Sequence, residues 1–291
     1  MIKNFAEHLN TAFDIVVIAG QSNAEGCGYG VADVPYEKDE RVYVMRDTES
    51  ARIVFDSENM PRLQANCPAV CNISVAEDNL PTANMGFSFA REYVKNDLLK
   101  GRKLLVIFAG VNGTGFTRPE WGEGNIMNSR LFAAIDEALQ LSPNNRLVAF
   151  LWHQGEHDVF ERSNNPVEEI EAFYYEKLKN LFCLLRARYG LPLLPIVTGG
   201  FVDEWRVMYE KQCDAVMNAT KKVCDEIGNA GFVEAYGLNS NNQEIGNGDN
   251  IHFSRKSQYI LGVKYYAAYK ENADKKAVLL LCKNWHINCR I

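Results

Sequence analysis

Residues 16–28 read VVIAGQSNAEGCG, and in them a run of apolar residues ends directly at Gln21, Ser22 and Asn23. Uninterrupted, β-branched apolar runs are typical of strands that are buried on both faces of a parallel sheet. Gly20 and the polar residues after it end the run. The stretch therefore predicts a buried strand whose carboxyl end presents a serine between two amide side chains.

The same kind of apolar run recurs along the chain and alternates with segments of helical periodicity. The predicted strands lie at residues 14–20, 41–45, 103–110, 146–152, 193–201 and 231–237. The predicted helices lie at residues 87–99, 128–141, 166–190, 206–228 and 255–271. This alternation predicts an α/β fold, a three-layer α/β/α sandwich with a mainly parallel sheet. We expect a single domain over residues 1–291, with a loop-rich insertion at 46–86 and a C-terminal tail of unassigned structure at 272–291.

Composition and charge exclude several classes of protein. Apolar residues make up 47% of the chain and charged residues 23%, which is the balance of a soluble globular protein. Lysine and arginine form no block of the kind that binds nucleic acid. No apolar run approaches the roughly 18 residues of a membrane helix. We therefore expect neither nucleic acid nor a membrane as a partner, and the sequence predicts no particular oligomeric state.

The N-terminal segment and the cysteines predict the compartment. The first ten residues, MIKNFAEHLN, lack the long apolar core of a signal peptide. The eight cysteines form no C-x-x-C pair, and Cys183 and Cys224 fall in helical patterns where buried thiols are expected. These features predict a cytoplasmic protein with reduced cysteines.

Four polar loops stand out from the pattern of strands and helices. Three of them follow predicted strands, at residues 21–23, 111–115 and 153–158, and the fourth, at 248–253, precedes the last predicted helix. In open α/β sheets, ligands bind at the carboxyl ends of the strands. We therefore expect these loops to converge on one site.

The residues of these loops suit a nucleophilic hydrolase. A serine hydroxyl such as that of Ser22 attacks only when an oriented base takes its proton. Asp249 and His252 lie three residues apart, so one turn could bring the carboxylate onto the imidazole. The chain order Ser, Asp, His is admissible because such triads are defined by geometry. The Ser22 amide, the Gly113 amide and the Gln154 side chain are candidate donors to an oxyanion.

Each motif alone also fits a purely structural role. A serine after a strand is often a turn residue or a helix N-cap, and Asp249 with His252 could form a capped turn. The glycines of residues 112–115 serve any loop, and Gln154 and Glu156 could satisfy loop backbone. Only the joint placement of the motifs favours an active site.

Three sequence blocks together resemble the SGNH hydrolases. They are GQSN after the first strand, HQGEHD after a central strand and DNIHFS before the last helix. They are most similar to the sialate O-acetylesterase and acetylxylan esterase-like branch, a carbohydrate esterase family 6-like group whose middle block reads Trp-x-Gln-Gly-Glu-x-Asp. The blocks span residues 14–255, and Trp152 fits the middle one. The resemblance implies a flavodoxin-like fold and an esterase that removes acetyl groups from sugar hydroxyls.

The resemblance also implies roles for single residues. Ser22 matches the nucleophile, His252 the general base and Asp249 its orienting carboxylate. Gly113 and Gln154 match the backbone and side-chain donors that join the Ser22 amide in the oxyanion hole. The implied mechanism needs no metal and no cofactor.

Further residues of the same blocks are expected to support the site. Glu156 matches a carboxylate that holds neighbouring loops by hydrogen bonds, and Gln21 and Asn23 flank the nucleophile. One departure from the family is Asn112, because relatives often have glycine immediately before the residue that matches Gly113.

The loop at 153–158 also contains a rival motif. His153, Glu156 and His157 satisfy H-x-x-E-H, a zinc pattern of metalloproteases. That pattern needs a helix to place both histidines on one face, whereas here it follows a strand and contains Gly155. A zinc hydrolase is therefore the weaker alternative.

The other alternative is a carbohydrate-binding protein without catalysis, since a fold does not imply a function. For an esterase, the expected substrate is an acetylated sugar or oligosaccharide, of the sialic acid or the xylan type. Four aromatic residues in or near the loops could stack on a sugar ring or pack the fold, and we assign them no role: Tyr29, Phe116, Trp121 and Trp205.

Overall fold

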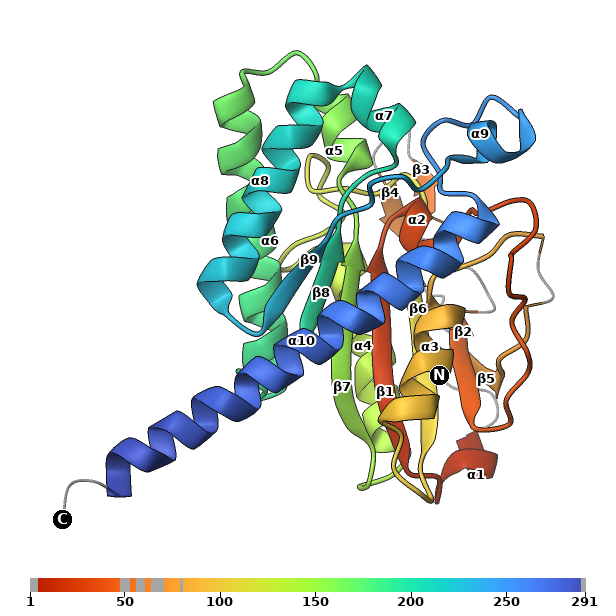
Figure 1. Cartoon of the computed structure of the whole chain (residues 1–291), viewed down its shortest axis with the longest axis vertical. Helices are drawn as coiled ribbons and strands as arrows, with labels where there is room; N and C mark the ends of the chain where they lie inside the picture. Colours follow the sequence, from red (N-terminus) through yellow and green to blue (C-terminus); the bar gives the residue numbers. More distant parts are fainter. Residues whose placement is uncertain (1–4, 48–52, 56–60, 64–70, 79–80, 289–291) are drawn as a thin grey trace.

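The computed structural model describes residues 5–47, 53–55, 61–63, 71–78 and 81–288. Its centre is a seven-stranded sheet in the order β5-β2-β6-β1-β7-β8-β9 (Figure 1). All neighbouring strands are parallel except β2 and β5. The strands are β1 (Phe13–Gly20), β2 (Val42–Asp47), β5 (Cys71–Val75), β6 (Lys103–Gly110), β7 (Arg146–His153), β8 (Ile196–Gly199) and β9 (Ala230–Val233). A separate hairpin pairs β3 (Ile53–Phe55) with β4 (Pro61–Leu63).

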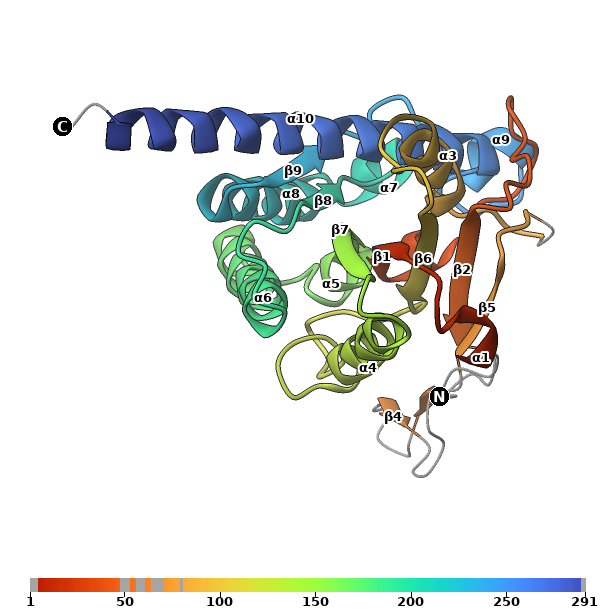
Figure 2. The ribbon, with the colours of Figure 1, turned by 90° about the horizontal axis from the view of Figure 1, so that it is seen from below.

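Helices cover both faces of the sheet, as Figure 2 shows. One face carries α3 (Gly86–Asn96) and α10 (Arg255–Asn288), and the other carries α4 (Ile126–Gln140), α6 (Val167–Arg188) and α8 (Glu210–Ile227). The short helices are α1 (Phe5–His8), α2 (Ser22–Glu25), α5 (Glu156–Glu161), α7 (Asp203–Met208) and α9 (Asn241–Ile245). The predicted α/β/α fold with a mainly parallel sheet is confirmed.

The central strand β1 is buried along its whole length, which explains its unbroken apolar sequence. Its one charged residue, Asp14, is 0% exposed and accepts hydrogen bonds from Arg102, Arg146 and Tyr93. Burial alone would raise the pKa of Asp14, but these hydrogen bonds outweigh it and hold the pKa below its ordinary value. The buried charge is therefore fully paired at the amino end of the strand.

Two predicted helices differ from the structure. The predicted helix 206–228 is divided into α7 and α8 at Tyr209, whose backbone leaves the helical region at φ −131° and ψ 43°. The ring of Tyr209 packs 4.5 Å from that of Trp205, so the break is stabilised by a side-chain contact. The last helix does not end at residue 271 but continues through the tail to Asn288, and its end projects beyond the sheet (Figure 1).

The expected insertion at 46–86 contributes structure to the sheet. Its described part supplies β5, which pairs antiparallel with β2 at one edge, and the hairpin of β3 and β4. Residues 48–52, 56–60, 64–70 and 79–80 of the insertion lie outside the described residues. The prediction of a single domain stays a prediction.

The cysteines differ in their burial. Cys224 is buried in α8 as expected, but Cys183 is exposed on α6, so the prediction of a buried thiol is wrong there. The helical pattern did not predict which side of α6 carries Cys183, and α6 buries only one of its sides. Among the described helices, none has the length and apolar character needed to cross a membrane.

Candidate active site

The loops after β1, β6 and β7 begin side by side at the carboxyl edge of the sheet. The pairing register sets Gly20 level with Gly110 on one side and with His153 on the other. Gly20 adopts φ +132°, and a Cβ there would lie 2.0 Å from the His153 backbone oxygen, so only glycine fits. The chain adds β2, β5 and β6 on one side of β1 and then crosses to add β7, β8 and β9 on the other side. Ligands bind at such a switch point of an open sheet.

Ser22 lies directly beyond this edge as the first residue of α2. Ser22 is buried, with 1% of its surface exposed. Among the described residues, no hydrogen-bond acceptor is found for the backbone N–H of Ser22 or for that of Gly113. Two predicted oxyanion donors are therefore without an acceptor among the described residues.

The loop at 248–253, which we call the Asp–His loop, brings the predicted base and its carboxylate together. Nδ1 of His252 lies 3.0 Å from Oδ1 and 2.9 Å from Oδ2 of Asp249. Asn241 donates a further hydrogen bond to Oδ2 of Asp249 at 2.8 Å. Burial alone would raise the pKa of Asp249, but the bonds from His252 and Asn241 lower it to about 2. An ionised Asp249 accepts the Nδ1 proton and leaves Nε2 of His252 as the basic nitrogen.

Asn23 joins the nucleophile segment to the Asp–His loop. Its Nδ2 donates to the Ile251 backbone oxygen at 3.2 Å, and its Oδ1 accepts from the Phe253 N–H at 3.1 Å. These two backbone groups lie on either side of His252. The residue after Ser22 therefore fixes the loop that carries the predicted base, a role that only tertiary contacts reveal.

The first prediction concerns this link. Asn23→Ala removes both bonds beside His252 and the 2.6 Å bond to the buried Oε1 of Glu156. A buried partner left unpaired costs about 1–3 kcal/mol, so we expect a lower melting temperature together with a lower kcat. Asn23→Asp should be worse, because it sets a second carboxylate against Glu156. A folded Asn23→Ala variant with wild-type kcat would refute the link.

Glu156 and His153 form a buried polar pair behind Asn23. Both side chains are 0% exposed, with His153 Nε2 3.6 Å from Glu156 Oε1. Burial would raise the pKa of Glu156, but His153 and Asn23 outweigh it and lower the pKa. Nδ1 of His153 also lies 2.8 Å from the Tyr265 hydroxyl. The geometry agrees with a structural role for Glu156, and the support from His153 and Tyr265 was not predicted.

The two glutamines of the site bond to each other and to α5. Oε1 of Gln21 accepts from Gln154 Nε2 at 3.1 Å and from the backbone N–H groups of Gly155 and His157. Gln154 Nε2 also contacts Asp158 Oδ2 at 2.8 Å and the Thr114 backbone oxygen at 3.4 Å. An amide has two N–H bonds, and protein acceptors occupy both. The role of Gln154 as an oxyanion donor stays a prediction, and it would require one of these bonds to be exchanged for a bond to the oxyanion.

The second prediction distinguishes these roles of Gln154. An oxyanion donor lost alone reduces kcat without destabilising the fold. Gln154→Ala instead removes a buried amide from Asp158 and Gln21, so we expect a melting temperature lower by several degrees as well as a lower kcat. Thermal unfolding and steady-state kinetics measure both. An unchanged melting temperature with a large loss of kcat would support the oxyanion role.

The loop at 111–115, which we call the oxyanion loop, is held from several sides. Thr114 Oγ1 donates to the Val111 backbone oxygen at 2.7 Å, and Trp121 Nε1 donates to Thr114 Oγ1 at 2.9 Å. Gly113 adopts φ +71°, with no atom within 4 Å of a Cβ placed there. The loop therefore has a fixed backbone whose Gly113 N–H is open.

The zinc alternative does not fit the placement of its residues. His153 ends β7, whereas His157 lies in α5, and Gly155 between them has φ +147°. The two histidines do not share a helix face as the motif requires.

Most of the aromatic residues near the loops pack the fold. Phe116 and Trp121 are buried, with ring centroids 5.8 Å and 4.9 Å from that of Trp152. Trp205 is also buried, whereas Tyr29 is 42% exposed. Of the four candidates, only Tyr29 faces solvent.

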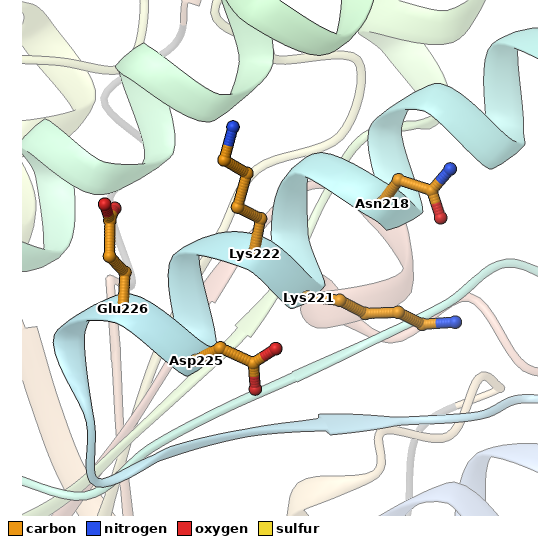
Figure 3. Close-up of a pocket in the computed structure, with 5 residues that line it drawn as sticks. All are labelled: Asn218, Lys221, Lys222, Asp225 and Glu226. Carbon is orange, nitrogen blue, oxygen red and sulfur yellow. The ribbon is translucent and has the colours of Figure 1, made fainter.

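A hollow of about 560 Å³ lies on α8, lined by Asn218, Lys221, Lys222, Asp225 and Glu226 (Figure 3). These residues are in the second half of α8, at the amino edge of the sheet, whereas the loops above lie at its carboxyl edge. Lys221 pairs with Glu234, and Glu226 pairs with Lys179. The hollow is separate from the candidate active site.

Comparison with protein families gives one match over most of the chain. Residues 12–271 match the model of the family described as carbohydrate esterase, sialic acid-specific acetylesterase. The matched range contains all three sequence blocks. Comparison with curated proteins finds no match.

Solved structures similar to this chain share its fold. An Arabidopsis thaliana protein has a TM-score of 0.64 at 21% identity, over 90% of this chain and 99% of that one. NanS has a TM-score of 0.62 at 16% identity, over 91% of this chain and 98% of that one. A carbohydrate acetylesterase from Xanthomonas citri has a TM-score of 0.59 at 14% identity, over 90% of this chain but 57% of that one. At these identities the likeness shows the fold alone.

Proposed function

The chain belongs to the sialic acid-specific acetylesterase family of carbohydrate esterases, and from this premise we propose that it is a serine esterase that removes O-acetyl groups from a carbohydrate. One observation carries the proposal. The loop that carries the Asp249–His252 pair is hydrogen-bonded to Asn23, the residue after Ser22. Base, carboxylate and nucleophile segment are thus held in one site.

The proposed reaction has two steps through an acyl-enzyme. Ser22 Oγ attacks the acetyl carbonyl carbon while His252 Nε2 takes the hydroxyl proton, and Asp249 stabilises the imidazolium. The N–H groups of Ser22 and Gly113 bind the oxyanion. The C–O bond to the sugar breaks, and His252 returns the proton to the sugar oxygen. Water, deprotonated by His252, then attacks the acetyl-serine and releases acetate.

The proposed substrate is an acetylated sugar or oligosaccharide. The family description names sialic acid, which supports an O-acetylated sialic acid as the first substrate to test. An acetylated xylo-oligosaccharide is the second. A comparison of kcat/KM between them decides which sugar the site prefers.

The test of the function is acetate release by the wild-type protein from 4-nitrophenyl acetate and from both sugars, with and without a chelator. We expect turnover that is unchanged by the chelator and stopped by a fluorophosphonate that labels Ser22. Labelling is read by peptide mass spectrometry. A folded protein that neither turns over these esters nor reacts at Ser22 would contradict the proposal and favour a binding protein.

A further inference from the structure

Glu25 lies on the same short helix as the predicted nucleophile but reaches the oxyanion loop. It ends α2, three residues after Ser22, at the carboxyl edge of the sheet (Figure 1). Its Oε2 accepts a hydrogen bond from the backbone N–H of Asn112 at 2.7 Å. Asn112 immediately precedes Gly113, whose own N–H is free. One carboxylate therefore connects the nucleophile helix to the predicted oxyanion donor.

The backbone of Glu25 is held on two sides, and this fixes the point from which its side chain extends to Asn112. A Cβ on Gly110 would lie 2.4 Å from the Glu25 backbone nitrogen, which shows how closely α2 packs on the end of β6. Asn84 Nδ2 donates to the Glu25 backbone oxygen at 2.9 Å. The side chain therefore starts from a rigid position and ends on the oxyanion loop.

We infer that Glu25 is a positioning residue of this esterase, which holds the Asn112 N–H so that the neighbouring Gly113 N–H stays directed at the reacting ester. The inference rests on the proposed function. Two consecutive N–H groups in a turn can both bind one anion. Because Glu25 takes the first of them, the second is left for the oxyanion, and the turn cannot rotate without breaking the bond.

The charge of Glu25 also interacts with charged groups on two neighbouring segments. The charged groups that act on its carboxylate are His252 from the Asp–His loop and Arg46 from β2. Glu25 is exposed as a whole residue, but partial burial of its carboxylate raises the pKa, although the Asn112 N–H, His252 and Arg46 oppose the rise. Arg46 also interacts electrostatically with Asp78, and Asp78 forms a salt bridge with Arg255. An ionised Glu25 therefore places a negative charge within electrostatic reach of the Asp–His loop.

Asn112 itself also limits the conformations of this turn. A glycine there would leave the turn more conformations, whereas asparagine restricts it. The bond from Glu25 to the Asn112 backbone restricts it further. The Glu25–Asn112 contact joins residues 87 positions apart, so no local motif reveals it.

The experiment separates hydrogen bonding from charge with two variants. Glu25→Gln keeps an oxygen that can accept the Asn112 N–H, and Glu25→Ala removes both acceptor and charge. We expect Glu25→Ala to lower kcat about tenfold with KM within about twofold, because a misaligned donor acts mainly in the transition state. Glu25→Gln should keep at least about half of kcat, because its amide oxygen still accepts the Asn112 N–H.

Controls make the outcomes distinct. Glu168→Ala, an exposed carboxylate in the first turn of α6, should leave kcat unchanged. Amide exchange of Asn112, measured by NMR, should be slow in wild type and Glu25→Gln and fast in Glu25→Ala. Wild-type kcat in Glu25→Ala, or equal losses in both variants, overturns the positioning role. A wild type without Ser22-dependent turnover instead overturns the proposed function, and slow Asn112 exchange in Glu25→Ala overturns the hydrogen bond independently of activity.

Discussion

Replacing Ser22 with alanine is expected to abolish ester hydrolysis, lowering kcat by at least about 10⁴-fold. The proposed acyl-enzyme needs an oxygen nucleophile at this position, and alanine supplies none. Asn23, the next residue, bonds to the backbone on both sides of His252. The loss is therefore one of chemistry and not of substrate binding. Steady-state hydrolysis of 4-nitrophenyl acetate by wild type and Ser22→Ala measures it.

The fold should survive this change. Ser22 is 1% exposed, and alanine keeps its Cβ and its place in α2 while removing one hydroxyl group. We expect a melting temperature close to wild type, which excludes unfolding as the cause of lost activity. Thr220→Ala, the loss of a buried hydroxyl in α8 at a distance from the loops, is the matched control and should retain kcat. Ester hydrolysis that survives Ser22→Ala and disappears with a chelator would support the zinc hydrolase instead.

Asp249→Asn is expected to lower kcat by about 10³–10⁴-fold while the imidazole stays in place. The asparagine side chain can present N–H groups to His252 Nδ1 and to Asn241 Nδ2, both of which now donate to the carboxylate. The backbone N–H groups of Ile251 and His252 favour the amide oxygen in the Oδ1 position, which sets the amide nitrogen in the Oδ2 position against His252 Nδ1. In that orientation His252 avoids two facing donors by carrying its proton on Nε2, the nitrogen that has to accept the proton from Ser22. The wrong tautomer therefore accounts for the loss.

The pH dependence of this variant gives an independent check. The pKa of Asp249 is lowered to about 2, so its ionised form stabilises the wild type above the ordinary pKa of an aspartate, and that stabilisation is lost as the pH falls toward about 2. Asp249→Asn should lose this acid-dependent contribution. Thermal unfolding between pH 2 and pH 5 measures it, with Asp225→Asn, at an exposed aspartate on α8, as the control. Near-wild-type kcat in Asp249→Asn would remove Asp249 from the mechanism.

The sequence by itself determined the layered fold and the edge of the sheet where the site lies. The apolar runs at 14–20, 103–110 and 146–152 became the three central parallel strands. Because these strands are parallel and in register, their following loops had to meet. The spacing of Asp249 and His252 likewise produced their contact, since three residues span one turn.

The tertiary structure alone decided which polar groups are free and which are already bonded. Gln154 donates to Gln21, 133 residues away, and to Asp158. Asn23 holds the Asp–His loop across 228 residues, and Glu25 holds the oxyanion loop across 87. Strand and helix patterns are local and follow from side-chain periodicity. A hydrogen bond across the site depends on two distant segments meeting at a given distance and angle, which no single segment encodes.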